Sequence, residues 1–272
     1  MNLTIPKNVK IYDVTVPPPK NTFFSLIGIC VSYNYFDTLQ FMLPVNHLHF
    51  EKLYVVTQED DTQTVEFCKS FENVIVLFYH FKNNGKKFDK FGALNYAQSL
   101  AYQNYPDSWY LLIDSDILLP NNFSTVLKDE ALNPECLYGA NRHDVFKSVE
   151  LLQKNKLVKE SKPLFVNGKL TVIGFFQLYK KKGFHPNHFT SAAAGDVAFC
   201  QQFQYVCVLE NIHCFHLGVP KQNWYGKMVS FIDDIHIPLK DIYYTCHTNR
   251  KNKIIDQRKT PTRMNLVLRM RI

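Results

Sequence analysis

Short apolar runs alternate with amphipathic stretches over the first half of the sequence. Four runs rich in aliphatic and β-branched residues predict strands at 24–32, 52–57, 74–79 and 109–113. These runs are apolar throughout, which is typical of strands that are covered on both faces of a parallel sheet. The stretches between them predict helices at 37–48, 62–70 and 90–103. This alternation is typical of βαβ units, so the sequence predicts an α/β fold with a mainly parallel sheet flanked by helices.

The pattern loosens after residue 116. Strands are expected at 137–140, 170–179 and 205–209, and helices at 145–158 and 195–203, with Asp196 in the first turn of the last helix. A carboxylate is favourable there because the N-terminal end of a helix carries partial positive charge. We expect this half to extend the same mixed sheet in one domain. The expected organisation is an N-terminal arm at 1–22, a domain at 23–249 with halves at 23–120 and 121–249, and a tail at 250–272.

The composition suits an ordinary globular protein. The 272 residues, 46% of them hydrophobic, are enough for one large core. The longest apolar run, 23–31, is far shorter than the roughly 18 residues that a membrane span needs, and residues 1–10 lack the apolar core of a secretory signal. Seven cysteines without a Cys-x-x-Cys pair favour a reducing, cytoplasmic compartment and free, buried thiols. The alternative is a zinc site at Cys200, Cys207 and Cys214 beside His213 and His216, although no set of four ligands at finger-like spacing is present.

The positive charge is concentrated at the end of the chain. Residues 250–272 hold eight Lys and Arg side chains against one acid, Asp256, which equals the net charge of +7 of the whole sequence. A neutral body with a basic tail does not favour a nucleic-acid-binding domain, whose charge usually spreads over a face. Two interpretations of the tail stay open: peripheral contact with an anionic surface such as a membrane, or a solvated terminus.

Asp114 and Asp116 form the most informative chemical pattern, because they follow the apolar run 109–113 directly. In parallel sheets, ligands bind beyond the carboxyl ends of the strands. The loops after Ser32, Thr57, Tyr79 and Ile113 are therefore expected to meet at one edge. Two carboxylates there need a cation or hydrogen bonds, and hard oxygen ligands suit Mg²⁺ or Mn²⁺ on a diphosphate. An acidic turn that caps the following segment is the alternative.

At this point the sequence resembles the GT-A nucleotide-sugar glycosyltransferases, and family 2 in particular. Residues 109–120 (WYLLIDSDILLP) are similar to the Asp-x-Asp segment of these enzymes, and 90–97 to the Lys/Gly/Asn helix before it. Further similar segments lie at 137–140, 174–179, 195–196, 213–218 and 223–226. Each motif is weak alone, but their order and spacing over 24–227 make the resemblance specific. It implies a GT-A fold and transfer of a sugar from a UDP- or GDP-sugar to a carbohydrate or other hydroxyl acceptor, with Mn²⁺ or Mg²⁺ as cofactor.

The resemblance also implies roles for individual residues. Asp116 and His216 would bind the cation, and Asp114 would contact it, a water on it, or the ribose. Residues expected to hold the donor are Ser32, Tyr33, Thr57, Asp60, Lys90, Asn95 and Asp114. Asp196 would be the general base of an inverting enzyme, although Gly195 stands where the family has a second acid. Arg142, with His143 and Asp144, and Trp224, with Tyr225, would lie on the acceptor side. On a strand, His213 and His216 would face opposite sides.

Two other functions fit part of the pattern. Haloacid-dehalogenase-type phosphatases also use Asp-x-Asp after an apolar strand, with the first Asp as nucleophile, and Asp233 and Asp234 could supply their later acidic pair. That fold places the Asp-x-Asp strand first, whereas three strands precede it here. The second alternative is a nucleotide- or carbohydrate-binding module that has lost turnover.

Overall fold

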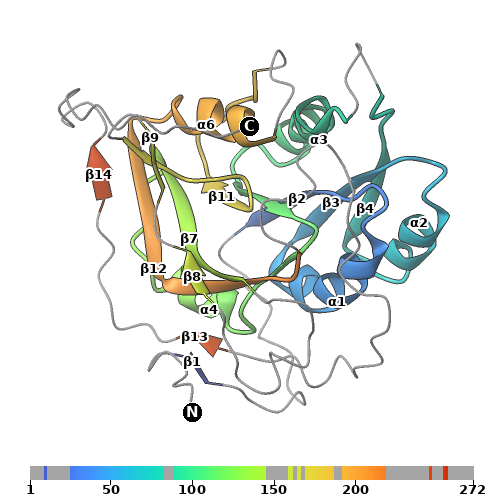
Figure 1. Ribbon diagram of the computed structural model, residues 1–272, viewed down its shortest axis with the longest axis horizontal. Helices are drawn as coiled ribbons and strands as arrows, with labels where there is room; N and C mark the ends of the chain where they lie inside the picture. Colours follow the sequence, from blue (N-terminus) through green and yellow to red (C-terminus); the bar gives the residue numbers. More distant parts are fainter. Residues whose placement is uncertain are drawn as a thin grey trace.

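A mixed sheet of ten strands runs through the described part of the chain. The computed structural model describes residues 9–10, 25–82, 88–144, 159–161, 164–166, 169–186, 192–218, 245–246 and 254–256. Eight strands follow one another in the order β14-β12-β7-β11-β5-β2-β3-β4, while β6 pairs with β12 and β8 with β7 (Figure 1). The bounds are β2 Leu26–Val31, β3 Lys52–Thr57, β4 Val74–Phe78, β5 Trp109–Asp114, β6 Ile117–Leu118, β7 Cys136–Asp144, β8 Lys159–Ser161, β11 Phe176–Tyr179, β12 Tyr205–His216 and β14 Ile254–Asp256.

The four strands β5, β2, β3 and β4 form the parallel part of the sheet. They coincide with the four predicted apolar runs to within about two residues at each end. All of β2 and nearly all of β3 and β5 are buried, as expected for strands covered on both faces. The connecting helices are α1 Phe36–Asn46, followed by the short 3₁₀ turn His47–His49, α2 Thr62–Cys68 and α3 Lys90–Asn104. The predicted α/β fold is therefore confirmed.

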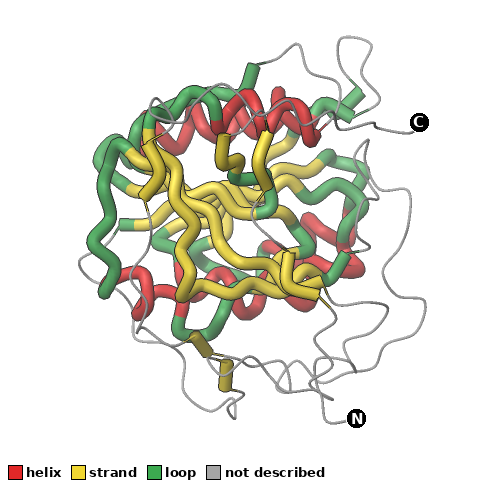
Figure 2. The backbone as a smooth tube through the Cα atoms, turned by 60° about the vertical axis from the view of Figure 1, so that its left-hand side comes forward, coloured by secondary structure: helices red, strands yellow, loops and turns green. Residues whose placement is uncertain are grey.

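Helices cover both faces of the sheet (Figures 1 and 2). One apolar layer holds side chains of α1, of α2 and of α4, which spans Phe123–Lys128. The opposite layer holds side chains of α3 and of α6, which spans Ala192–Cys200. Pairs of two-residue or three-residue strands lie outside the large sheet: β1 Val9–Lys10 with β13 Thr245–Cys246, and β9 Leu164–Val166 with β10 Lys169–Thr171.

The second half departs from the predicted boundaries in four places. The strand expected at 137–140 extends as β7 from Cys136 to Asp144. The single strand expected at 170–179 is divided into β10 and β11, and β11 inserts antiparallel between β5 and β7. The strand expected at 205–209 continues to His216, because a shift in register after Leu209 keeps β12 paired with β7. Helix α6 begins at Ala192 rather than at residue 195. Asp196 is therefore not in its first turn, and the predicted stabilisation by the helix end is wrong. The predicted helix 145–158 lies outside the described residues.

Six of the cysteine side chains are described, and all six are buried free thiols, as expected. Cys207 and Cys214 lie in the apolar layer that contains α1 and α4, whereas Cys200 lies in the opposite layer. The sheet separates these thiols, and no group of three or more His, Cys, Asp and Glu side chains in the described ranges is arranged to hold a metal. The alternative of a zinc site at the three cysteines is thus not supported. Within the described part of the chain, we find no helix with the length and hydropathy needed to cross a membrane.

Asn46 links α1 to the segment that follows β5. Its side chain is fully buried, donates to the carbonyl of Ile117 over 2.8 Å and accepts from the amide of Leu119 over 2.9 Å. Both contacts lie just after Asp114 and Asp116, so Asn46 fixes the chain where the acidic pair emerges.

We expect Asn46→Ala to destabilise the protein strongly. The substitution removes the partner of two buried backbone groups, which costs about 2–4 kcal/mol in the free energy of unfolding. Urea denaturation should show a lower midpoint with an unchanged slope. Asn104→Ala is the control, because Asn104 is exposed on α3 and makes a single contact, of 3.4 Å, to Tyr54. A midpoint in Asn46→Ala equal to that of Asn104→Ala would contradict this role.

Candidate functional site

The loops that follow the parallel strands meet at one edge of the sheet, as the sequence predicted. The amide of Asn34, after β2, donates to Asp61, after β3, over 2.8 Å. The hydroxyl of Tyr79, after β4, donates to Asp89 at the start of α3 over 2.8 Å. Lys90, the first residue of α3, contacts Asp114 at the end of β5. The amide of Phe81 also donates to the side chain of Gln58 over 3.3 Å, so these contacts join the segments that follow all four parallel strands into one site.

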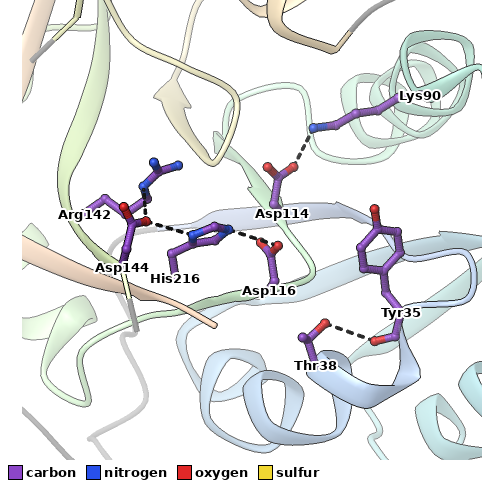
Figure 3. A network of polar contacts seen from close by, with 8 residues as sticks. All are labelled: Tyr35, Thr38, Lys90, Asp114, Asp116, Arg142, Asp144 and His216. Atoms are coloured by element: carbon purple, nitrogen blue, oxygen red, sulfur yellow. Dashed lines mark hydrogen bonds and ion pairs between the residues drawn. The ribbon is translucent and has the colours of Figure 1, made fainter. Parts of the chain in front are cut away.

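Lys90 and Asp114 form an ion pair at the centre of this edge, with Nζ 2.6 Å from Oδ1 (Figure 3). Asp89 precedes Lys90 and accepts a hydrogen bond from the amide of Gly92, which caps α3 and fixes its first residue. Burial alone would lower the pKa of Lys90, but the carboxylates of Asp114, Asp196 and Asp116 together outweigh it, and the pKa is raised. The lysine is therefore a cation held among carboxylates.

Asp116 belongs to a chain of charged contacts that crosses from β5 to β12 and β7 (Figure 3). Its Oδ2 is 3.2 Å from Nε2 of His216, whose Nδ1 is 2.9 Å from Oδ1 of Asp144. Nε of Arg142 lies 3.1 Å from the same Oδ1. Burial lowers the pKa of His216, but Asp116 and Asp144 outweigh it and raise this pKa to about 9. His216 thus lies between two carboxylates, one of which belongs to the predicted Asp-x-Asp motif.

His213 does not share this site. It lies on the same strand as His216, three residues earlier, and its Nδ1 is 2.9 Å from Nε2 of His143. Burial and the second imidazole lower the pKa of His143 to about 4. His213 and His216, predicted to face opposite sides of a strand, thus have separate partners.

Asp196 lies on α6, on the face of the sheet where α3 also packs. Its side chain is only 6% exposed, and Oδ1 has no hydrogen-bond partner among the described residues. A Cβ atom at Gly174 would lie 2.3 Å from that oxygen, so only glycine fits there. Burial raises the pKa of Asp196 to about 7, although the positive charge of Lys90 opposes the shift. The structure therefore provides a buried carboxyl that titrates near neutral pH.

The expected donor residues at the ends of β2 and β3 are also close together. The Tyr33 ring stacks on Phe81 at 5.1 Å, and its hydroxyl donates to the exposed Asp60 over 3.2 Å. The hydroxyl of Thr57 donates to Asp61 over 3.0 Å. Ser32 is fully buried, and its hydroxyl has no hydrogen-bond partner among the described residues.

Three residues of this edge were missed by the sequence reasoning. Asp61, rather than Asp60, is the buried carboxylate that links the segments after β2 and β3. Its position just before α2, where it caps the helix, could have identified it from the sequence. Asp144 was predicted to lie on the acceptor side, and its contact with His216 was not predicted. Tyr35 follows Asn34, whose φ of 62° turns the chain, and points towards Asp114 and Asp116 (Figure 3). Burial and these two carboxylates raise the pKa of Tyr35.

The side chain of Asn95, predicted to hold the donor, contacts the backbone of His185. The amide of Asn95 donates to the carbonyl of His185 over 2.9 Å and accepts from its backbone amide over 2.8 Å. Asn95 thus holds a loop in place, and we leave it out of the proposed site. Trp224 lies outside the described residues, as do Asp233 and Asp234 of the phosphatase alternative.

The residues around Asp116 fit a divalent cation. Oδ1 of Asp116 is buried and has no hydrogen-bond partner among the described residues. A Cβ at Gly218 would lie 2.3 Å from Oδ2 of Asp116 and 2.9 Å from Nε2 of His216, so glycine keeps that space free of a side chain. Although the described residues contain no three-ligand cluster, Mg²⁺ and similar ions on phosphates are usually held by one or two side chains together with phosphate oxygens. A carboxylate and an imidazole are suitable ligands for Mn²⁺.

No protein-family model matches the sequence, and no curated protein matches it significantly. Among solved structures, TarS of S. aureus is similar to it with 13% identity and a TM-score of 0.48, over 73% of this chain and 37% of TarS. The inositol-1-phosphate CTP transferase of T. maritima is similar with 14% identity and a TM-score of 0.39, over 71% of this chain and 89% of that one. The chain thus spans little more than a third of TarS. These identities and scores are too low to transfer an activity, so the functional assignment rests on the site itself.

Proposed function

We propose that this protein transfers a sugar from a nucleoside-diphosphate sugar to a hydroxyl group of an acceptor, with Mn²⁺ or Mg²⁺ as cofactor. The observation that carries the proposal is the convergence of Asp114, Asp116, His216, Lys90 and Asp196 at the carboxyl edge of a mainly parallel sheet. Open α/β sheets bind their ligands at this edge. A partly buried set of acids, one lysine and one imidazole can bind a diphosphate through a cation and also accept a proton.

Asp116 and His216 would hold the cation, and Lys90 would add a second positive charge. When bound, the cation supplies Lewis-acid stabilisation of the departing nucleoside diphosphate. Lys90 is the first residue of α3, and its ammonium is already neutralised by Asp114. It can move towards a phosphate without leaving a buried unpaired charge, while Asp114 turns to the ribose or to the cation.

Asp196 would act as the general base. Its unpartnered Oδ1 and its pKa of about 7 suit a carboxylate that takes a proton near neutral pH. In the reaction, the acceptor hydroxyl gives its proton to Asp196 as its oxygen bonds to the anomeric carbon. The bond from that carbon to the diphosphate breaks, and the nucleoside diphosphate leaves with the electron pair. This attack from the face opposite the leaving group inverts the anomeric centre.

The two sides of the edge would receive donor and acceptor. The base and ribose of a UDP- or GDP-sugar would lie by Ser32, Tyr33, Thr57 and Asp60. These residues lie at or just after the carboxyl ends of β2 and β3, and β2 is the strand that pairs with β5, which ends at Asp114. A carbohydrate or other hydroxyl acceptor would lie towards Arg142 on β7. Trp224 stays a candidate for stacking on a sugar.

The experiment that tests this proposal follows the products released from a panel of UDP- and GDP-sugars, with Mn²⁺ and a mixture of simple sugar acceptors. We expect release of UDP or GDP with one donor, and none when the metal is removed by a chelator. Release of inorganic phosphate from simple phosphate esters instead would support the phosphatase. Binding of a nucleotide-sugar without any turnover would support the inactive module.

A further inference from the structure

Asp144 on β7 has no part in the binding of donor or acceptor proposed above, yet it is one of the most firmly held acids of the site. It is 6% exposed, and His216 is 8% exposed. β7 and β12 are parallel, and their register places His216 opposite Asp144. Because a strand ladder fixes which residues are neighbours, the two side chains are held together by the sheet itself.

The contact with Asp144 determines which nitrogen of His216 can bind a metal ion. A neutral imidazole carries its proton on one nitrogen, and the hydrogen bond at that nitrogen sets which one it is. Nδ1 of His216 lies 2.9 Å from Asp144, an acceptor, whereas Nε2 points to Asp116 at 3.2 Å. Near neutral pH the metal-free imidazole carries a proton on both nitrogens. When His216 loses one proton to bind a cation, Asp144 keeps the other on Nδ1, so the lone pair is freed on Nε2, on the side of Asp116.

Arg142 holds Asp144 from the other side (Figure 3). Its Nε is 3.1 Å from the same carboxylate oxygen that contacts His216. The guanidinium also lies over the ring of Phe175 at 5.1 Å, which restricts its own movement. The carboxylate is thus fixed by an arginine and in turn orients an imidazole.

We infer that Asp144, held by Arg142, is a positioning residue that orients His216 for the divalent cation. The inference rests on the proposed function, since it needs a cation at Asp116 and His216. Carboxylates behind metal-binding histidines fix the ring and its tautomer, and their loss typically weakens metal binding by about 10–100-fold.

The first test measures binding of Mn²⁺ alone to the full chain, from the loss of the electron paramagnetic resonance signal of the free ion. Asp144→Ala should weaken Mn²⁺ binding by about 10–100-fold, whereas Glu135→Ala should not change it. Glu135 is the matched control, because it is an exposed acid just before β7 that pairs with Lys181 at 2.9 Å, far along the strand from Asp144. If Asp144→Ala does not fold, the isosteric Asp144→Asn replaces it and should weaken binding by a smaller factor.

The second test needs no metal. In metal-free protein labelled with ¹⁵N-histidine, the Nδ1–H of His216 should give a slowly exchanging signal, assigned by its absence in His216→Gln. The signal should persist in Glu135→Ala and disappear in Asp144→Ala. Its persistence in Asp144→Ala, or unchanged Mn²⁺ binding in that variant, would overturn the inference and leave the proposed function intact. A wild-type chain that does not bind Mn²⁺ would overturn both the inference and the metal site.

Discussion

Asp116→Asn is expected to abolish metal-dependent donor binding and to lower transfer at least about 100-fold, the scale at which loss of a strong electrostatic stabiliser reduces turnover. Asparagine keeps the size of the side chain but loses the negative charge that a divalent cation requires. The carboxylate is partly buried. Burial alone would raise its pKa, but the nearby His216 holds that pKa below the ordinary value, so the group is ionised at neutral pH. The measurement is the rate of nucleoside-diphosphate release across a range of Mn²⁺ concentrations.

Asp60→Asn is the matched control for this substitution. Asp60 is an exposed acid at the same edge that contacts Tyr33 and Gln58, both outside the charged chain around His216. We expect this variant to keep its dependence on Mn²⁺, with at most a weaker affinity for the donor. Wild-type activity in Asp116→Asn would remove Asp116 from the metal site.

Asp196→Asn should lower transfer by about 10²–10⁴-fold, the usual contribution of a general base, and leave donor binding unchanged. The pH profile gives a second signature. Because burial raises the pKa of Asp196 to about 7, the ionised base forms as the pH rises through 7. The transfer rate of the wild type should therefore increase between about pH 6 and 8, and the residual rate of Asp196→Asn should lack this step.

The raised pKa of Asp196 increases the transfer rate as the pH rises, but it lowers the stability of the folded protein over the same pH range. A carboxyl whose folded pKa lies above its unfolded value of about 4 binds a proton more tightly in the folded state. Its contribution to stability is lost as the pH rises from about 4 through 7. Asp196→Asn should therefore gain stability relative to the wild type above pH 7, measured by urea denaturation at pH 5 and pH 8. A pH-independent difference between the two proteins would contradict the raised pKa.

The parallel half of the fold could be predicted from the sequence because its signals are local. β2, β3 and β5 are continuous apolar runs, and such runs identify strands that are covered on both faces. The chain order of strands and helices then places the carboxyl ends of the strands together. This order placed Asp114 at that edge, whereas Lys90, 24 residues earlier in the sequence, was assigned to the same site through the resemblance to the glycosyltransferases.

The second half depends on contacts that the sequence does not encode locally. β11 enters the sheet antiparallel between β5 and β7, and the polar residues Glu210 and Asn211 interrupt the apolar pattern of β12 although the strand continues. The same applies to Asp144, which meets His216 only through the pairing of β7 with β12, 72 residues apart in the sequence. A local pattern could point to Asp116 but not to the residues behind it.

The central claim is that a nucleoside-diphosphate sugar binds at this edge through a cation at Asp116. Thermal unfolding of the wild type with a panel of nucleoside diphosphates and nucleotide-sugars, each with and without Mn²⁺, tests it most directly. A ligand at 100 times its Kd should stabilise the folded protein by about 2.7 kcal/mol, which is readily seen as a higher Tm. We predict a Mn²⁺-dependent shift with one nucleotide, and its loss in Asp116→Asn. A folded wild-type protein whose Tm is unchanged by every nucleotide in the presence of Mn²⁺ would contradict the claim.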